Sequence, residues 1–396
     1  MAVNELSFNQ ISTVLADIVS QATGQAQITP TDTSSFVSVA QAGLLAGYDP
    51  LMTAISQVLS RTIFSVRPYE RKFKSLEADP IRYGNHVRKL QIADKGFEDD
   101  DRFKLVDGES IDQQVVNKPV TLQTNFYGAN VWQKSVTIYR DQLDCAFSSP
   151  EEFQRFLGMV MQNVQDMIEQ AHEQTARMTV ANLIAGTIEG GTDAQIVYLV
   201  DEYAAHIGAG TTDFNPFDPD IFPDFSRWVF GRIASISKAL RERTLRYHVA
   251  LDDYDIMRHT PVRDQRLIMF SPIFDDIDAR VLSTTFNDAY LRLLDHEEVT
   301  FWQSTDSPAE IQVKASYIDE DAKLVTMDSA GTYEGVVGVL FDREAAGYTP
   351  VNQWSAPAPF NARGGYTNLY WHFTDRYWND FSENAVVFML RAPENP

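Results

Sequence analysis

The sequence has very little cysteine and no long apolar run, and each absence excludes a class of protein. Cys145 is the only cysteine among 396 residues, so neither an intrachain disulfide nor a cysteine zinc site can form. No stretch approaches about 18 consecutive apolar residues, the length of a membrane-spanning helix, so we expect no contact with a membrane. The first residues lack the basic start and apolar run of a signal peptide. We therefore expect the chain to stay in the cytoplasm where it is made.

Basic residues are also scarce. Lysine and arginine number 33 against 55 aspartates and glutamates, which gives a formal net charge of -22. Sequence-independent binding of nucleic acid needs clustered lysine and arginine to neutralise phosphate, so the chain is a poor candidate for it. The hydrophobic content of 44% is enough for a substantial core. The length fits about two to three ordinary domains.

The longest element that the sequence predicts is an amphipathic helix over 149–186. Ser149 and Pro150 are typical of a helix start, with serine at the cap and proline at the first helical position. At 1.5 Å per residue the helix is roughly 55 Å long, and we expect a spine that ends at Gly186. Steps of three and four place these apolar residues on one stripe: Phe153, Phe156, Leu157, Val160, Val164, Met167, Ile168, Ala171, Met178 and Ala181. We expect the stripe to face a sheet built from the hairpin base and the C-terminal strands.

The segment before residue 72 carries three short apolar helical faces, at 11–19, 36–44 and 51–59. Glycine and proline residues separate them. Short helices joined in this way rarely form a core by themselves. We therefore expect an arm that packs on a neighbouring subunit, and a body that folds without the arm.

The hydrophobic period changes to two between residues 72 and 144, which indicates strands over 86–92, 115–122 and 130–139. A polar stretch joins the first two, and we expect a long β-hairpin with a charged tip. The acidic run 98–101 in this stretch has two interpretations. We prefer to interpret the run as a solvated loop. The alternative interpretation is an ion-pairing surface for a neighbouring subunit.

The second half of the chain mixes helices and strands and ends in an aromatic-rich segment. We expect a helix capped by Asp224, and another over 286–294. Turns are expected at 379–380 and 383–384, followed by a terminal strand over 385–390 that pairs with the aromatic segment. Further strands are predicted over 247–251, 266–270 and 336–341.

No set of residues has the complete pattern of a catalytic or metal site. Glu169 and His172 have the Glu-x-x-His spacing of di-iron helices, but the motif is not repeated, so we interpret His172 as a polar helix residue. Cys145 has no histidine nearby in the sequence, and we interpret it as a buried structural thiol. We therefore predict no catalytic, cofactor-binding or metal-binding residues and no cofactor.

Several short stretches are similar to phage major head proteins. They lie at 54–61, 123–128, 149–153, 339–342, 364–368 and 375–381. The order of helical arm, long hairpin, spine helix, mixed segment and returning strand resembles the HK97-like fold of the major capsid proteins of tailed bacteriophages. The resemblance covers most of the chain and depends on the number and order of the stretches.

This resemblance implies an α+β fold with an N-terminal arm at 1–72 and an extended loop, a β-hairpin, at 73–128. The peripheral domain takes 129–200 and 366–396, with the spine helix in it, and the axial domain takes 201–365. The resemblance also implies hexamers and pentamers in an icosahedral shell, with a portal and scaffolding or other head proteins. The shell encloses double-stranded DNA without sequence-specific binding. The expected location is the capsid of the virion, after assembly in the cytoplasm of the host bacterium.

Two alternative functions are left open. One is an encapsulin-like compartment shell, which shares the fold but encloses enzymes. The other is a cytoplasmic metal-dependent hydrolase that uses Asp252, Asp253, Asp255 and His259, although the acidic stretch lacks the glycine and glutamate of a calcium loop. Electron microscopy separates a shell from a small enzyme, and enclosed DNA separates a phage head from a compartment.

Overall fold

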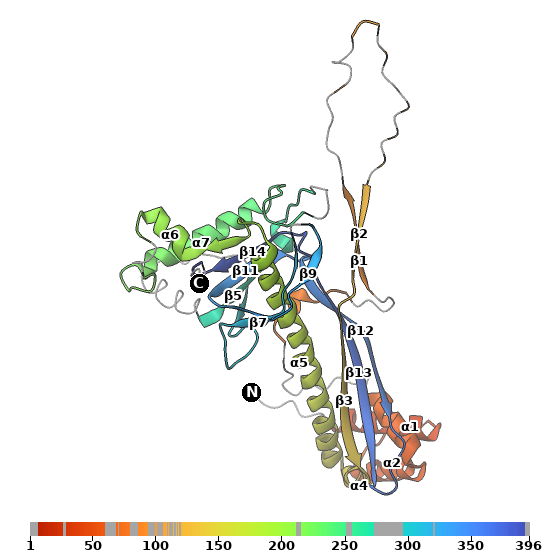
Figure 1. The fold of residues 1–396 in the computed structure, drawn as a ribbon. Helices are drawn as coiled ribbons and strands as arrows, with labels where there is room; N and C mark the ends of the chain where they lie inside the picture. The colour runs from red at the N-terminus through yellow and green to blue at the C-terminus, as the bar shows by residue number, and fades with distance from the viewer. Residues whose placement is uncertain are drawn as a thin grey trace.

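The chain forms two folded parts along one long helix, and a hairpin projects from the region between them (Figure 1). The structure is a computed structural model. It describes residues 7–26, 29–59, 69, 71–79, 86–93, 120–210, 215–250, 256–272, 296–319 and 321–392, with short pieces between 100 and 118. None of the described helices is long and apolar enough to cross a bilayer.

The long helix is α5 (Pro150–Gly190), with 41 residues. Its start is as predicted, because the Oγ of Ser149 accepts a hydrogen bond from the Glu152 N–H at 3.3 Å. The predicted end at Gly186 is wrong, since the helix continues for another turn. A Cβ at Gly186 would lie 2.3 Å from the carbonyl oxygen of Ser316. Glycine therefore permits close packing at this position and does not end the helix.

A three-stranded antiparallel sheet packs on the N-terminal half of α5. Its order is β12 (Ala346–Pro357), β13 (Tyr366–Asn379) and β3 (Ala129–Tyr139). The core between helix and sheet contains Phe153, Phe156, Val160, Val164, Ile138, Leu369, Trp371 and Phe373. The first half of the predicted stripe therefore faces the sheet, but Met167 is 40% and Met178 48% exposed, and Ala181 packs in the other core. Ile168 packs on the core between helix and sheet, because it lies four residues after Val164 on the same side of the helix.

The N-terminal helices enlarge this same core. They are α1 (Phe8–Thr23), α2 (Thr33–Leu45) and α3 (Tyr48–Leu59), and α4 (Arg140–Ala146) precedes the long helix. Leu15, Phe36 and Leu51 are fully buried, and the Phe36 ring lies edge-on to Phe153 with centroids 5.9 Å apart. The short helices thus pack on the chain's own sheet and α5, and not on a neighbouring subunit as predicted.

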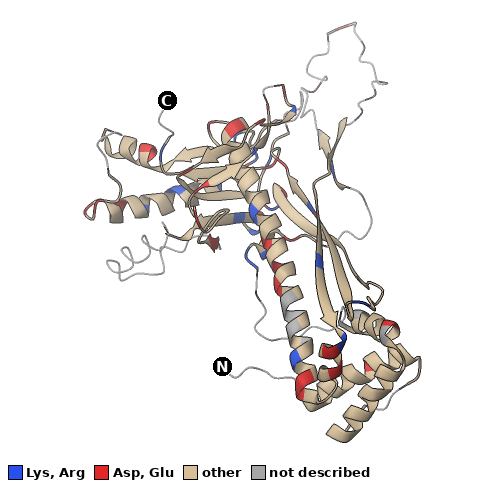
Figure 2. Cartoon of the chain, turned by 60° about the horizontal axis from the view of Figure 1, so that its bottom comes forward, with Lys and Arg blue, Asp and Glu red and all other residues tan. Residues whose placement is uncertain are grey.

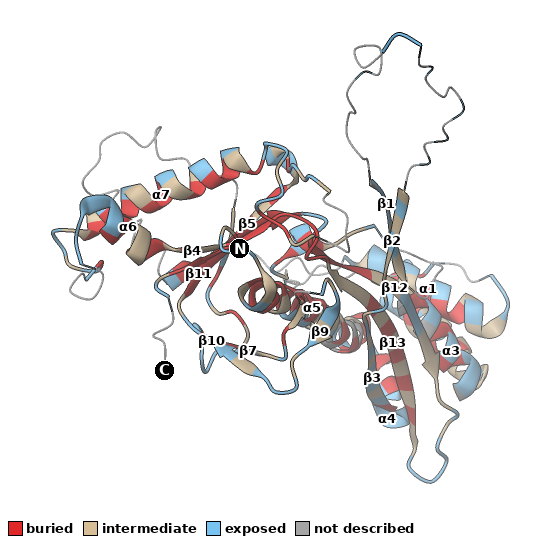
Figure 3. Cartoon of the chain, turned by 45° about the horizontal axis from the view of Figure 1, so that its top comes forward, coloured by how far each residue is buried: buried red, intermediate tan, exposed pale blue. Residues whose placement is uncertain are grey.

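The second folded part is built on a five-stranded sheet. Its order is β4 (Ile196–Tyr198), β14 (Ala385–Met389), β11 (Val336–Asp342), β5 (Gln265–Phe270) and β6 (His296–Val299). Helices α6 (Leu199–Ile207) and α7 (Phe222–Ala239) cover one face, and the C-terminal half of α5 packs against the other. Every residue of β11 is buried, so this strand forms the centre of the part (Figure 3).

Most predicted elements of this half are present. The strands predicted at 266–270, 336–341 and 385–390 are confirmed. The cap predicted at Asp224 is wrong, because α7 begins at Phe222 after Ile221 and Asp224 lies within its first turn. The strand predicted at 247–251 is wrong, because residues 247–250 form turns and irregular backbone. The helix predicted at 286–294 lies outside the described residues. Two small ribbons complete this half: β7 (Ile311–Val313) with β10 (Gly331–Tyr333), and β8 (Ser316–Ile318) with β9 (Leu324–Thr326).

The projecting hairpin consists of β1 (Val87–Ala93) and β2 (Val120–Phe126). Val87 lies opposite Phe126 at its base, and Ala93 lies opposite Val120 at its outer end. The second strand therefore runs four residues beyond the predicted 115–122, because it pairs along the whole of β1. Apart from Asp100, the acidic run 98–101 lies outside the described residues.

The sheets divide the chain differently from the predicted domain boundaries. Strand β12, which the sequence did not predict, falls within 201–365 but pairs with β13 of the other part. Strand β14 falls within 366–396 but belongs to the five-stranded sheet. The expected pair of terminal strands is therefore wrong, since the turn at 380–384 leads the chain from one sheet into the other. Pairing between strands far apart in the sequence decides which sheet each strand joins, and no local sequence pattern predicts that pairing.

Candidate functional site

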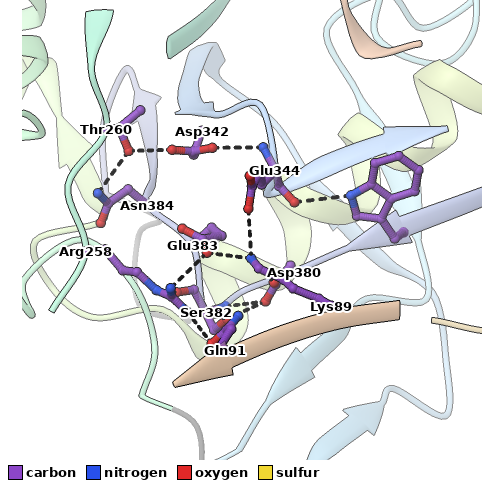
Figure 4. Close-up of polar contacts among 11 residues, drawn as sticks. Lys89, Gln91, Arg258, Thr260, Asp342, Glu344, Asp380, Ser382, Glu383 and Asn384 are labelled. Carbon is purple, nitrogen blue, oxygen red and sulfur yellow. Dashed lines mark hydrogen bonds and ion pairs between the residues drawn. The ribbon is translucent and has the colours of Figure 1, made fainter. Parts of the chain in front are cut away.

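The hairpin joins the body through polar side chains of β1. Lys89 and Gln91 are partly or fully buried, whereas the alternate residues Leu90 and Ile92 are 68% and 64% exposed. This reverses the usual strand alternation, in which apolar residues face the core. The inward-facing polar residues meet Arg258 and the turn at 380–384 (Figure 4). We call this set of contacts the hairpin-base network.

Lys89 makes the first connection between β1 and the turn. Its Nζ lies 2.7 Å from Asp380 Oδ2, also contacts the carboxylate of Glu383, and lies 3.5 Å from Glu344 Oε2. Burial disfavours the charged ammonium, but attraction to Asp380 and Glu383 outweighs burial, so the pKa of Lys89 is raised. The lysine is therefore charged at all physiological pH values and fastens the hairpin to the turn.

Arg258 makes the second connection. One guanidinium nitrogen donates to Gln91 Oε1 at 2.6 Å, and Nε donates to the carbonyl oxygen of Ser382 at 3.0 Å. The other terminal nitrogen lies 3.2 Å from Glu383 Oε1. The planar fork of donors thus holds β1 and the turn at a defined spacing, which the single nitrogen of a lysine cannot do.

A chain of hydrogen bonds holds the far side of the turn. Asn384 Nδ2 donates to Thr260 Oγ1 at 3.1 Å, and Thr260 donates to Asp342 Oδ2 at 2.8 Å. The other oxygen of Asp342 accepts from the Glu344 N–H at 2.9 Å. The turn is therefore bonded to the end of the central strand β11 as well as to the hairpin (Figure 4).

The network contains more carboxylates than its cations can fully compensate. Burial raises the pKa of Glu383, although Lys89 and Arg258 attract its charge, and burial likewise raises the pKa of Asp342. Burial and the neighbouring Arg258 lower the pKa of His248, so this imidazole is neutral at pH 7 and supplies no further positive charge. The arrangement is suited to positioning the hairpin, and the raised pKa of Glu383 means that Lys89 and Arg258 only partly compensate the cost of burying its charge.

A second polar contact fastens residues 69–77 across the middle of α5. One nitrogen of Arg71 lies 3.0 Å from both carboxylate oxygens of Glu169, and the other pairs with Glu77. The Tyr69 hydroxyl donates a hydrogen bond to the Glu173 carboxylate, and burial together with this hydrogen bond raises the pKa of Tyr69 to about 12. The phenol therefore stays a neutral donor at physiological pH.

Arg177 extends this contact by one helical turn. Its Nε donates to Glu173 Oε1 at 2.8 Å, and its guanidinium carbon lies 3.8 Å from the centroid of the Phe301 ring. Both charged side chains are buried, so the middle of α5 carries a buried ion pair between its two apolar halves.

Glu169 and His172, which have the Glu-x-x-His spacing, make contacts with other side chains. His172 Nδ1 lies 2.9 Å from Asp375 Oδ2, and its ring stacks on Tyr348 with centroids 6.0 Å apart. Glu169 pairs with Arg71. His172 is a polar helix residue, as interpreted, but it is buried against the sheet. Across the part of the chain that the structure describes, no three possible ligands gather at one point.

Of the other candidates, Cys145 and His259 lie within the described residues. Cys145 is exposed, so its interpretation as a buried thiol is wrong, because α4 buries Leu143 and Ala146 on its other side. Asp252, Asp253 and Asp255 lie outside the described residues, and His259 is exposed.

The hairpin-base network was not predicted from the sequence. The polar residues at every second position of β1 were a signal, and turns were predicted at 379–380 and 383–384 without this contact to β1. Lys89 and its carboxylate partners are 291 and 294 positions apart, and no local pattern connects residues at that separation.

Comparison with known proteins gives one family match. The model of the family described as Phi29-like phage major capsid protein matches residues 15–389. Among solved structures, a chain in the capsid structure of Staphylococcus phage Andhra is similar with a TM-score of 0.56 and 10% identity, over 84% of this chain and 87% of that one. A chain in a structure of native bacteriophage P68, described by its head fiber and inner core protein gp22, has a TM-score of 0.53 and 11% identity, over 83% and 87%. These identities support similarity of fold. No curated protein matches the chain in sequence.

Proposed function

The chain belongs to the family of Phi29-like phage major capsid proteins, and we propose that it builds the icosahedral head of a tailed phage from hexamers and pentamers. It is a structural protein of the viral capsid with an HK97-like fold. The observation that carries the proposal is the match over 15–389, which includes both folded parts and the hairpin. The match gives no support to an encapsulin-like compartment or to a metal-dependent hydrolase.

Each part of the fold has a proposed role in the shell. The hairpin within 73–128 is the extended loop, and residues 1–72 are the N-terminal arm. The sheet β12–β13–β3 with the first half of α5 is the peripheral domain, and the five-stranded sheet with α6 and α7 is the axial domain. The separate apolar cores of these two parts support this division.

The shell encloses double-stranded DNA without sequence-specific contacts and assembles with a portal and a scaffolding or equivalent head protein. The net charge of -22 supports weak contacts with DNA, because strong binding of phosphate needs clustered cations. Assembly takes place in the cytoplasm of the host bacterium. The chain has no catalytic centre in this proposal, which agrees with a family of structural proteins.

Electron microscopy of the expressed chain tests the proposal. We expect closed shells with angular facets, in which a reconstruction resolves rings of six and five subunits. A discrete monomer or dimer at every concentration and salt tested would contradict shell formation. Nuclease-resistant double-stranded DNA in particles from the native source would establish the content of the shell, and enclosed enzymes without DNA would contradict it.

A further inference from the structure

Arg266 is a cation without an acidic partner, in a chain where acidic residues outnumber basic ones by 55 to 33. Its Nη1 donates to the carbonyl oxygens of Arg263 and Gln265, each at 3.0 Å. Its Nε is buried without a hydrogen-bond partner, and no carboxylate of the described residues pairs with its guanidinium group. A buried donor without an acceptor lowers stability, and the loss is larger for a charged group. An anion that accepts from this Nε would remove the loss.

The fold holds this guanidinium group in place. Arg266 is the second residue of β5, and Ile268 and Phe270 follow it on the same side of the strand. Both are buried in the core between the five-stranded sheet and the C-terminal half of α5, which fixes the backbone that carries Arg266. The two bonds from Nη1 fix the orientation of the group and leave its Nε edge for another acceptor. A binding group that is already positioned loses less entropy when a ligand binds.

A cavity of about 610 Å³ lies beside Arg266. The polar residues of its wall include Ser75, Arg263 and His296, and the carboxylate of Glu297 belongs to the same wall. The Arg263 side chain is 85% exposed, so its charge is accessible from the cavity. The cavity therefore places a second arginine and a hydroxyl group near the unpaired Nε.

Further arginines lie near Arg266. It also lines a second cavity, of about 730 Å³, together with Arg88 and Arg343. Arg88 is exposed and has no ion pair with any described residue, and the Arg343 side chain lies 3.7 Å from Asp264. Basic positions are thinly spread along the chain (Figure 2), so several arginines around one concave region are unusual here. Such a region attracts anions.

We propose that the cavity beside Arg266 binds a small phosphate ester and that the Nε edge of Arg266 holds the phosphate group. This edge presents two parallel N–H donors, from Nε and Nη2, which match two oxygens of one phosphate. Arg263 and the hydroxyl of Ser75 bind the remaining oxygens. The volume is typical of small-molecule sites, about 300–1,000 Å³, and a phosphate group alone would leave most of it empty. The organic part of the ligand lies against Val262, which is 46% exposed, and the ring of His296.

A carboxylate ligand and duplex DNA fit this site less well. A carboxylate carries a single charge, whereas a phosphate ester carries about -1.5 to -2 at pH 7, which suits a site with two arginines. Duplex DNA carries about one charge per 1.7 Å, and Glu297 in this cavity and Glu77 and Glu344 in the second would repel neighbouring phosphates. The site lies within one chain, so the inference goes beyond the shell-forming function and does not rest on it.

Calorimetric titration of the unassembled full chain with adenosine monophosphate tests the site, and adenosine is the matched ligand without the phosphate. We expect adenosine monophosphate to bind and to raise the melting temperature, inorganic phosphate to bind more weakly, and adenosine to have no effect at the same concentration. Arg266→Gln should weaken the binding of adenosine monophosphate by about tenfold or more, because it removes hydrogen bonds to a charged group. Arg263→Gln should weaken it by about threefold, since this side chain is exposed.

Two control variants should bind like the wild type. Arg155→Gln removes an exposed arginine of α5 outside the cavity wall, and Arg343→Gln changes the second cavity alone. Arg263→Gln alters an exposed position, so it tests the site even if Arg266→Gln does not fold.

Several results would overturn the proposal. One is the absence of binding of both adenosine monophosphate and inorganic phosphate at millimolar concentration. Others are equal binding of adenosine and adenosine monophosphate, or wild-type affinity in Arg263→Gln and in a folded Arg266→Gln. Weaker binding in Arg343→Gln with unchanged binding in Arg263→Gln would mean that the wrong cavity was chosen. Competition by duplex DNA that is lost in the same variants would assign the site to the DNA backbone. Shell formation, measured separately by electron microscopy, does not affect these results.

Discussion

Single residues set how closely the long helix approaches the second folded part. Gly186 lies in the interior of α5, where a Cβ would be 2.3 Å from a backbone oxygen and 2.5 Å from the Phe381 ring. Gly231 lies in α7 with open space around its Cα. The two glycines therefore have opposite expected responses to the same substitution.

Gly186→Ala should lower the free energy of unfolding by about 1–3 kcal/mol, because the added methyl forces backbone to shift. Gly231→Ala should raise it by about 0.5–1 kcal/mol, since alanine is the better helix former. Thermal unfolding of the unassembled variants measures both. A Gly186→Ala variant as stable as Gly231→Ala would contradict the close packing of α5.

Glu383 is the residue whose titration should be visible in stability. Burial raises its pKa above the ordinary value of 4.5, so the folded chain binds this proton more tightly than the unfolded chain. The contribution of this group to stability is then complete below about pH 4.5 and is lost as the pH rises through the folded-state pKa. Glu383→Gln removes this titration.

The melting temperature of Glu383→Gln relative to the wild type should therefore rise as the pH increases from about 4.5 toward neutrality. Glu151→Gln, at an exposed position in the first turn of α5, serves as the control and should follow the wild type. If the melting temperatures of Glu383→Gln and the wild type changed in parallel with pH, burial would not raise the pKa of the Glu383 carboxyl.

At the scale of elements, the hairpin depends on the body for its direction. A two-stranded ribbon is at best marginally stable alone. Lys89 and Arg258 are the charged contacts that fasten β1 to the turn at 380–384. The direction of the ribbon should therefore change when one of them is removed.

Arg258→Gln should lower stability by about 1–3 kcal/mol and make the hairpin more accessible, because buried acceptors on Gln91 and Ser382 lose their donor. Faster limited proteolysis within 87–126 and a lower yield of shells are the expected results. Arg155→Gln removes an exposed arginine and should change neither. An unchanged cleavage rate in Arg258→Gln would mean that other contacts orient the hairpin.

The N-terminal helices belong to the body in this structure. Leu15 is fully buried in the core shared with α5 and the three-stranded sheet, whereas Leu45 at the end of α2 is 88% exposed. The expectation that the body folds without the arm must therefore be revised, since deleting these helices would expose the core that they share with α5.

Leu15→Asp should destabilise the unassembled subunit by several kcal/mol, about 3–5, because it buries an unpaired charge. Leu45→Asp should change stability by less than about 0.5 kcal/mol. Chemical denaturation of both variants distinguishes them. Equal denaturation midpoints of the two variants would mean that the N-terminal helices do not pack on their own subunit in solution, as expected for an arm that packs on a neighbouring subunit.

At the scale of the whole molecule, α5 connects two separate apolar cores. Its first half contributes to the core with the three-stranded sheet, and its second half contributes to the core beneath the five-stranded sheet. The buried Glu173–Arg177 pair lies between them. Cores joined in this way commonly unfold as distinct cooperative units.

We therefore expect two calorimetric transitions. Val164→Asp should lower the midpoint temperature of one of them, by an amount that corresponds to several kcal/mol of stability, and leave the midpoint of the other nearly unchanged. Gln170→Asp on the exposed side of the same helix is the control, with an expected change below about 0.5 kcal/mol. Gln165 is less suitable as a control because it is half-buried. A single transition that shifts as a whole would show that α5 couples the two cores into one unit.

The sequence by itself determined the local elements with strong periodicity or clear boundary residues. The start of α5 at Ser149, its buried stripe, the central strand β11 and the first strand of the hairpin were predicted from spacing and capping residues. The absence of a second cysteine excluded an intrachain disulfide. These properties depend on residues a few positions apart, so a local pattern contains them.

Only the tertiary structure decided which elements pair and which polar residues meet. The pairing of β12 with β13, the passage of β14 into the other sheet, and the contacts of Lys89 with residues almost 300 positions away depend on separations that no periodicity records. Gly186 is an example at a single position. The sequence pattern predicted that it ends the helix, but in the structure it allows the backbone carbonyl of Ser316 to approach α5 closely. Burial and hydrogen bonding are properties of the assembled fold, and they give such residues their functions.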